Sequence, residues 1–180
     1  MDTDALDVIR KGFVALAEGL VSIPPVLSMI IAEQNGEVDV KTSYIQSVPQ
    51  FAIKVSPGFI DNPKLGLPSV NGLMILFSSK TGMIEALLLD KGNLTEICTA
   101  LAGALAAENL AKPEIQTFGI IGAGAQARLQ ARGLQPVRKI ELLQVWSRNQ
   151  DKSELYCIEM EAMLKIPGTI QTDRHALVES

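Results

Sequence analysis

A glycine-rich segment between two apolar runs carries the clearest chemical signal in this chain. Residues Gly122–Ala127 have the pattern Gly-x-Gly-x-x-Gly/Ala, which is typical of backbones that bind the pyrophosphate of a dinucleotide. Gly122 permits a tight turn, and Gly124 has no Cβ, so a pyrophosphate can approach the main chain. Ala127 is small enough for a helix to pack closely on the preceding strand. The amides that open this helix would face the phosphates, and the helix dipole favours negative charge there.

Two strands and a helix are predicted around this segment. Thr117–Ile121 is a short apolar run with a β-branched bias and predicts a buried parallel strand. Ala125–Leu134 has helical composition, and Ile140–Trp146 is a second apolar run. The motif alone is weak evidence, but a strand, a helix and a second strand around it make dinucleotide binding the favoured interpretation. The alternative is a glycine-rich turn in another kind of α/β protein.

The end of the second strand bears on the choice of cofactor. An acidic residue there would bind the 2′-hydroxyl of NAD, and this chain has Ser147 and Arg148 instead. A hydroxyl beside a guanidinium suits a 2′-phosphate, so the sequence predicts NADP. NAD stays an alternative because Asp151 is close in sequence, and Arg148 would then be a solvated loop residue.

The first 90 residues predict one helix and about five mainly antiparallel strands. Apolar residues recur at helical spacing over Ala5–Leu20, and the double proline that follows ends helical structure. The later runs alternate or are bounded by turn residues, as strands are. These strands are expected at Val26–Ile31, Val38–Tyr44, Phe51–Val55, Gly72–Phe77 and Met83–Leu89.

A long helix is predicted over Leu94–Lys112, where alanines dominate. Asn93 is placed to cap it, with Glu96 as the reciprocal partner three residues on. Cys98 falls on the apolar stripe of this helix, so the sequence favours a small core cysteine over a reactive nucleophile there.

After Arg148, the sequence predicts a further helix and a third parallel strand. The helix is expected over Asp151–Leu164, with Asp151 and Glu154 at capping-box spacing, and the strand at Thr169–Thr172. The predicted fold class is therefore α/β. An N-terminal α+β domain with its connecting helix is expected over residues 1–112, and a partial Rossmann domain, a doubly wound parallel sheet, over residues 113–180.

Composition narrows the classes of partner. The chain has 180 residues and a net charge of −4, which gives no reason to expect nucleic acid or an anionic membrane as partner. No apolar run approaches the ~20 residues of a membrane span, and the acidic start does not resemble a signal peptide. Two cysteines without metal-ligand spacing indicate a reduced, cytoplasmic setting and no metal. The mean hydropathy of +0.22 is high for a monomer, so a large buried interface or a missing portion is expected.

Several short stretches occur together, and in the same order, in one known family. They are Asp39–Thr42, Ile53–Phe59, Asp61–Pro63, Gly66–Ser69, Thr81-Gly82, Leu94-Thr95 with Thr99-Ala100, Ile121–Gln126 and Val145–Arg148. Through them the chain resembles the ornithine cyclodeaminase/mu-crystallin family over nearly its whole length, closest to the branch found with ectoine degradation and to the imino-acid reductases. The resemblance implies a homodimer whose N-terminal domain builds the dimer interface and substrate pocket, and a Rossmann domain that carries NAD(P).

The resemblance also implies chemistry and site residues. Family members move hydride between a nicotinamide and the Cα of a small amino acid or its imine; cyclodeaminases then lose ammonia and close a ring. Lys54 matches the family's catalytic lysine at the substrate, although taken alone it would be a solvated strand lysine. Ser69 matches a hydroxyl residue near the nicotinamide, although taken alone it would be a turn serine. Ala125 and Gln126 match the amide-bearing residues over the pyrophosphate.

Two departures from the family pattern bear on activity. Cys98 and Ser28 stand where the family has arginines for the substrate carboxylate, and neither can bind a carboxylate bidentately. The acid/base aspartate of the family has no counterpart in these 180 residues, and His175 matches no catalytic position. Two hypotheses therefore stand: an NAD(P)-dependent enzyme of this family with impaired activity, or a non-catalytic remnant that binds NADPH and dimerises as mu-crystallin does.

Overall fold

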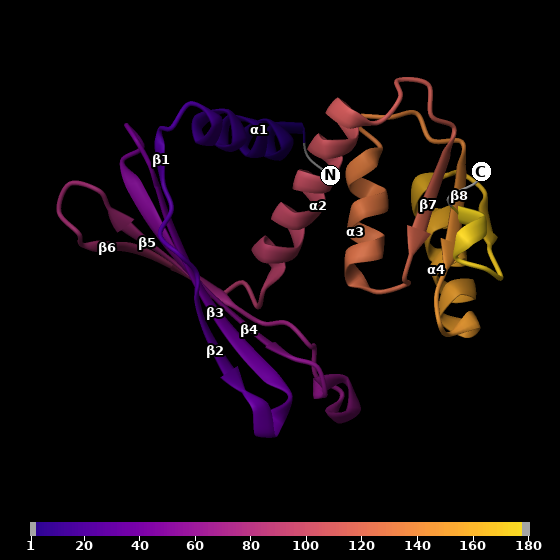
Figure 1. The fold of residues 1–180 in the computed structure, drawn as a ribbon, viewed down its shortest axis with the longest axis horizontal. Helices are drawn as coiled ribbons and strands as arrows, with labels where there is room; N and C mark the ends of the chain where they lie inside the picture. Colours follow the sequence, from indigo (N-terminus) through magenta and orange to yellow (C-terminus); the bar gives the residue numbers. More distant parts are fainter. Residues whose placement is uncertain (1–2, 178–180) are drawn as a thin grey trace. The chain divides into compact units, whose positions relative to one another are not determined.

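The structure, a computed structural model, describes residues 3–177 and has the predicted α/β class (Figure 1). It contains an antiparallel sheet and a separate three-stranded parallel sheet. Lys11–Thr95 forms one compact unit, and the described parts of Met1–Arg10 and Glu96–Ser180 form the other. The domain boundary expected between residues 112 and 113 stays a prediction, since α2 (Asn93–Leu110) contributes residues to both units.

The unit Lys11–Thr95 is built on six antiparallel strands. They are β1 (Val21–Ser22), β2 (Leu27–Ile31), β3 (Gly36–Ile45), β4 (Gln50–Phe59), β5 (Leu73–Ser78) and β6 (Ile84–Leu88), with short 3₁₀ helices η1 (Ala32–Gln34) and η2 (Asn62–Leu65). The order is β1-β3-β4-β5-β6, and β2 also pairs with β3. The sequence missed β1, a two-residue strand that pairs with the end of β3, because so short a run has no periodicity.

The two faces of this sheet differ in chemistry. Residues that oppose one another in an antiparallel pair project to the same face. One face therefore carries a polar set on β2, β3 and β4, which includes Ser28, Glu37, Asp39, Lys41, Ser43, Lys54 and Ser56. The opposite face is apolar, and there the rings of Phe51 and Phe77 stack with centroids 5.0 Å apart.

In the other unit, α2 packs against the start of α1 (Thr3–Ala17). Leu6 of α1 is buried with Leu101, Ala104 and Leu105 of α2. The guanidinium of Arg10 forms two hydrogen bonds to the carboxylate of Glu108, at 3.0 and 2.8 Å. The side of α2 that faces the interior carries Ala100, Leu101, Ala104 and Leu105.

Two predicted helix caps are wrong. Asn93 is the first residue of α2, and the amide of Leu94 instead donates to Asp90 Oδ2 at 2.6 Å. At the start of α4 (Gln150–Leu164), Asn149 is the cap, and its side chain accepts from the Lys152 amide at 2.9 Å. Both correct caps lie before the predicted ones, because each helix begins earlier than the apolar pattern indicates.

The parallel sheet has the order β7-β8-β9, with β7 (Thr117–Ile121), β8 (Leu142–Trp146) and β9 (Gly168–Ile170). Helices α3 (Ala125–Leu134) and α4 contact each other and both pack on Leu143 and Val145, which project from one side of β8. The short helix η3 (His175–Leu177) completes the described chain. Within residues 3–177, no helix is long and apolar enough to cross a membrane.

Candidate dinucleotide and substrate sites

The turn between β7 and α3 has the geometry that a phosphate requires. Gly122 has a φ of +113°, a conformation that side chains rarely adopt, and its amide donates to the Trp146 carbonyl at 2.7 Å. Gly124 is the N-cap of α3 with an extended backbone and no side-chain cap. A Cβ built on Gly124 would have no described atom within 4 Å. Packing within the described chain therefore leaves open space beside the first amides of α3, where a pyrophosphate would bind.

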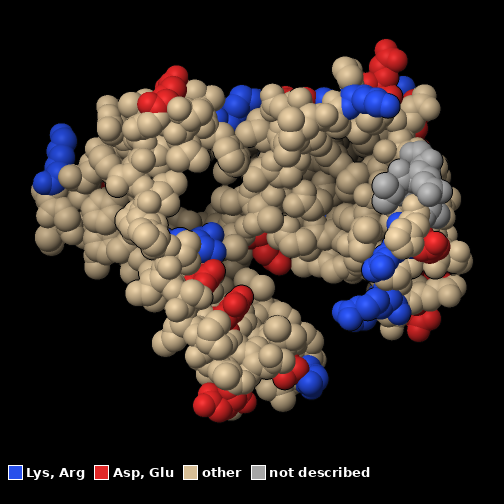
Figure 2. All heavy atoms as spheres, viewed as in Figure 1, with Lys and Arg blue, Asp and Glu red and all other residues tan. Residues whose placement is uncertain are grey.

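An open groove of about 550 Å³ runs from this turn to the end of β8. It is lined by Ile121, Gly122, Ala123, Gly124, Trp146, Ser147, Arg148, Asn149, Lys152 and Arg174. Figure 2 shows lysine and arginine side chains gathered over the part of the molecule that carries the C-terminal elements. The groove thus joins free helix amides to a basic end.

Ser147 and Arg148, which the sequence predicts to bind a 2′-phosphate, differ in whether their side chains already have partners within the protein. The Ser147 hydroxyl donates to the Asn149 carbonyl at 2.7 Å and lies 2.8 Å from the hydroxyl of Ser153. Arg148 is exposed, and within residues 3–177 its guanidinium forms no hydrogen bond or ion pair. The positive charge is therefore available to a ligand, while the hydroxyl already has partners.

The sequence missed two further cations that line the groove, Lys152 and Arg174. Lys152 lies in the first turn of α4, where a positive charge opposes the helix dipole. A lysine at this unfavourable position could have indicated an anion site from the sequence, because a bound anion would offset the repulsion between the lysine and the helix dipole. Arg174 follows β9, and only the tertiary fold brings it to the groove.

Arg128 of α3 holds the glycine turn in place from behind. Its Nη1 donates to the carbonyls of Ala123 and Gly124 at 2.7 and 3.1 Å. Its Nε donates to Glu159 of α4 at 2.7 Å, and the guanidinium lies 5.5 Å from the ring centroid of Tyr156. The turn, α3 and α4 are thereby tied together by one side chain.

Ala125 and Gln126 open α3, as the resemblance implies. The Gln126 side chain is directed to α2, where its Nε2 donates to the Glu96 carbonyl at 3.2 Å. Any contribution of Gln126 to a phosphate would therefore come from its main-chain amide.

In the other unit, Lys54 lies on the polar face of the sheet. It is half-buried and lines a hollow of about 340 Å³ together with Lys41, its direct partner across β3 and β4. The ammonium of Lys41 forms an ion pair with Asp39 at 2.8 Å. A hydrogen bond from Lys41, then one from Ser28, lowers the pKa of Asp39 below its ordinary value, and the charge of Lys54 adds to this.

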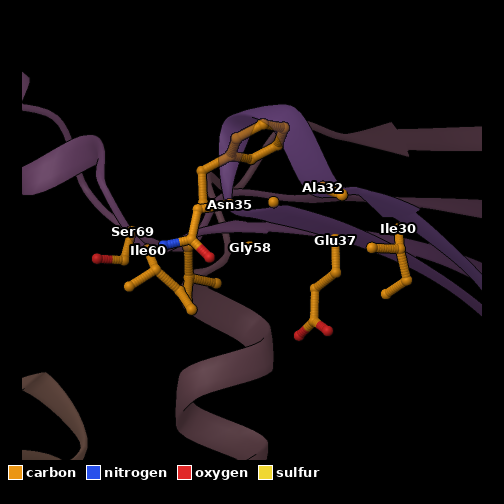
Figure 3. A pocket seen from close by; sticks show the side chains of 10 residues that line it. Ile30, Ala32, Asn35, Glu37, Gly58, Ile60 and Ser69 are labelled. Carbon is orange, nitrogen blue, oxygen red and sulfur yellow. The ribbon is translucent and has the colours of Figure 1, made fainter.

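Ser69 lies in a different hollow, of about 500 Å³, at the start of β3 and the end of β4 (Figure 3). Asn35, Gly58 and Ile60 also line it, and Glu37 and Ile30 lie toward its other side in the figure. The Ser69 carbonyl accepts the Phe59 amide at 2.7 Å. The structure thus does not bring Lys54 and Ser69 into one hollow of their unit, and their roles stay predictions.

The interpretation of Cys98 as a core residue is wrong, because its side chain is exposed. The buried side of α2 carries Ala100, Leu101, Ala104 and Leu105, so the real interior stripe is rotated away from Cys98. His175, which matches no catalytic position of the family, is exposed in η3.

Comparison with known proteins gives the class to which this arrangement belongs. The family model described as ornithine cyclodeaminase/mu-crystallin family matches residues 1–179. A protein of Sinorhizobium fredii named as an uncharacterized cyclodeaminase is 51% identical over 155 residues, which cover 86% of this chain and 47% of that protein. The Thermococcus litoralis Δ1-pyrroline-2-carboxylate reductase in complex with NADH and L-proline superposes with a TM-score of 0.91 at 29% identity, over 97% of this chain and 54% of that one. An archaeal alanine dehydrogenase dimer with bound NAD gives 0.87 at 26% identity, over 98% and 53%.

The chain therefore belongs to the ornithine cyclodeaminase/mu-crystallin family. Its fold is that of the Rossmann-containing proteins of this family. The chain spans about half the length of the relatives that it matches.

Proposed function

We propose that this chain serves NAD(P)-dependent hydride transfer between a nicotinamide and the Cα of a small amino acid or its imine, as imine reduction or deaminating cyclisation. The observation that carries the proposal is the open space at Gly124, beside the free amides that begin α3. The similar reductase binds NADH and L-proline, a cofactor and an amino acid of these classes.

The glycine turn and its surroundings fit a dinucleotide in two respects. The amides of Ala125 and Gln126 would donate to the pyrophosphate, with Gly122 and Gly124 allowing its approach. Arg128 would keep the turn in one conformation through its two carbonyl contacts. The bound nicotinamide would supply or accept the hydride, while Lys54 would hold the substrate through its charge.

We assign the cofactor as NADP. The proteins of known structure that the chain resembles bind NADH or NAD, but three exposed cations, Arg148, Lys152 and Arg174, line this chain's groove. A 2′-phosphate offers the compensating charge, and a guanidinium can bind it bidentately.

Isothermal titration of the chain with NADPH and with NADH tests this assignment. Replacing one charge-assisted contact, as in Arg148→Ala, is expected to weaken NADPH binding about 10- to 150-fold and to leave NADH within about 2-fold. Lys112→Ala is the matched control, since Lys112 is exposed beyond the end of α2 and does not line the groove. Equal losses for both nucleotides in Arg148→Ala would contradict the assignment to NADP.

We also propose that the chain forms a homodimer through the apolar face of the antiparallel sheet. Leu27, Met29 and Leu87 project to that face and are 62%, 52% and 55% exposed. Exposed apolar area of this extent marks an interface. Light scattering should give a dimer that Leu87→Lys weakens and that the control Ile158→Lys, on the exposed side of α4, does not. A monodisperse wild-type monomer would contradict this.

A second candidate function is nucleotide binding without catalysis. It is favoured by Ser28 and Cys98, the uncharged residues at the two positions where arginines are expected. Incubation with Δ1-pyrroline-2-carboxylate and NADPH separates the two functions. Oxidation of NADPH would establish the reductase, whereas saturable NADPH binding without turnover would establish the second function.

A further inference from the structure

Two glutamines on α3 bind the main chain of α2 within the unit that contains the parallel sheet. Gln126, in the first turn of α3, donates from Nε2 to the Glu96 carbonyl oxygen at 3.2 Å. Gln130, one turn further along, donates from Nε2 to the Thr99 carbonyl oxygen at 3.3 Å. Figure 1 shows α2 and α3 side by side, and these contacts show that both helices run in the same direction. Since residues three or four apart share one side of a helix, the two hydrogen bonds form one continuous contact.

The two helices approach each other closely along this contact. A Cβ built on Gly103 of α2 would clash with Oε1 of Gln130. A Cβ built on Gly133 of α3 would lie 3.1 Å from the Ala100 carbonyl oxygen. The side chain of Gln130 therefore lies directly over a residue of α2 that has no side chain.

Packing alone does not explain the amide group of Gln126. Its Oε1 is buried and has no hydrogen-bond partner within residues 3–177. A buried acceptor without a partner lowers the stability of the fold. An apolar side chain of the same length would avoid that cost, so the amide is better explained by the direction in which its donor holds α3.

The residue that contacts α2 also belongs to the phosphate-binding turn. Gln126 is the second residue of α3, and its main-chain amide is one of those that begin the helix without a side-chain cap. A hydrogen bond weakens steeply as it departs from a straight line. A small change in the direction of α3 would therefore weaken the bonds from its first amides to a pyrophosphate beside Gly124.

We propose that Gln126 and Gln130 are positioning residues for the nucleotide. They hold the first two turns of α3 on α2, so that the amides which begin α3 point at the pyrophosphate. The inference rests on the proposed function, because it requires a dinucleotide beside Gly124. It gives Gln126 a side-chain role in addition to its main-chain amide, and it adds Gln130 to the residues that decide affinity.

Isothermal titration with NADPH and with NADH, alongside thermal unfolding, tests the inference. Gln126→Met keeps the length of the side chain and removes the donor, so both nucleotides should bind about 2- to 10-fold more weakly. The losses should be equal, because the pyrophosphate is common to both nucleotides. Gln135→Met is the matched control, since Gln135 follows α3 and donates to the Leu164 carbonyl of α4 at 3.4 Å. This control should bind both nucleotides as the wild type does.

Gly103→Ala tests Gln130 without any change in α3. The added methyl group would displace the Gln130 side chain, whose contact with α2 is exposed to solvent. Alanine is a better helix former than glycine, so the midpoint of thermal unfolding should not fall. Both nucleotides should nevertheless bind about 2- to 10-fold more weakly. In a Gln130→Ala background, Gly103→Ala should have no further effect on binding, because the contact is already absent.

The outcomes separate the inference from the proposed function. A wild type that binds neither nucleotide would overturn both. A wild type that binds them, together with folded Gln126→Met and Gly103→Ala chains of unchanged affinity, would overturn the inference alone. A lower unfolding midpoint in Gln126→Met at unchanged affinity would show a structural role and would also overturn it. If Gln126→Met does not fold, Gly103→Ala and Gln130→Ala decide: weaker binding in both supports the inference, and unchanged binding overturns it.

Discussion

Replacing Gly124 by alanine adds one methyl group, which should affect nucleotide binding but not folding. Gly124 has φ −91° and ψ −168°, which any residue adopts, and a Cβ there would meet nothing described within 4 Å. The added methyl group would instead occupy the space that we assign to the pyrophosphate. The substitution should therefore damage binding and spare the fold.

The expected sizes follow from the geometry of the turn. Gly→Ala at an unstrained position stabilises by about 0.4–1 kcal/mol through the unfolded chain. Alanine is a poorer N-cap than glycine by up to about 1 kcal/mol. The two effects oppose each other, so the free energy of unfolding should change by less than about 1 kcal/mol. Loss of one charge-assisted bond from an amide to the pyrophosphate should weaken nucleotide binding about 10- to 150-fold.

The assay is isothermal titration with NADPH and NADH alongside thermal unfolding. Gly122→Ala is the contrasting variant, because its φ of +113° strains any side chain and should lower stability by about 1–3 kcal/mol. A Gly124→Ala chain that binds both nucleotides as tightly as wild type would refute the placement of the pyrophosphate. Unfolding of Gly124→Ala would refute the claim that the space is open.

Three further predictions concern the elements that support the groove. Asp90→Ala should lower the stability of the chain by about 1 kcal/mol, since Asp90 caps α2, whereas Asn93→Ala should change it by less than about 0.5 kcal/mol in chemical denaturation. Tyr156→Phe removes the hydroxyl that donates to the Ala127 carbonyl at 3.0 Å and should cost about 0.5–1.5 kcal/mol at neutral pH. Burial raises the pKa of Tyr156, so its stabilisation is complete below pH ~10 and is lost as pH rises further; the wild type should lose more stability than Tyr156→Phe above that pH. Arg128→Met frees two carbonyls of the glycine turn and should weaken NADPH binding several-fold in the same titration, and unchanged binding would show that the turn is rigid without it.

The parts of the fold with strong local signals could be predicted from the sequence. β7 and α3 have the predicted bounds, because an apolar strand, a tight glycine turn and a helix start follow one another without a gap. The helix caps could not be predicted in this way. Several polar residues precede each helix, and only the backbone geometry decides which of them accepts a hydrogen bond from a helix amide. Asp90 and Asn149 therefore had to come from the structure.

In the candidate sites, too, features that are local in sequence could be predicted and features that depend on the tertiary fold could not. Gly122 and Gly124 are local in sequence, and their backbone geometry follows from the motif. Lys152 and Arg174 reach the groove from separate elements, and the pairing of Lys41 with Lys54 depends on strand register. The order of residue types along the chain does not show which of them become neighbours, because residues far apart in sequence meet only in the folded protein.

Titration of the purified chain with NADPH and NADH, followed by the fluorescence of Trp146, tests the central claim most directly. Trp146 lines the groove between the glycine turn and Arg148, so bound nucleotide should quench its emission. The account predicts saturable quenching, tighter with NADPH than with NADH. A chain that is folded by circular dichroism and responds to neither nucleotide would contradict it.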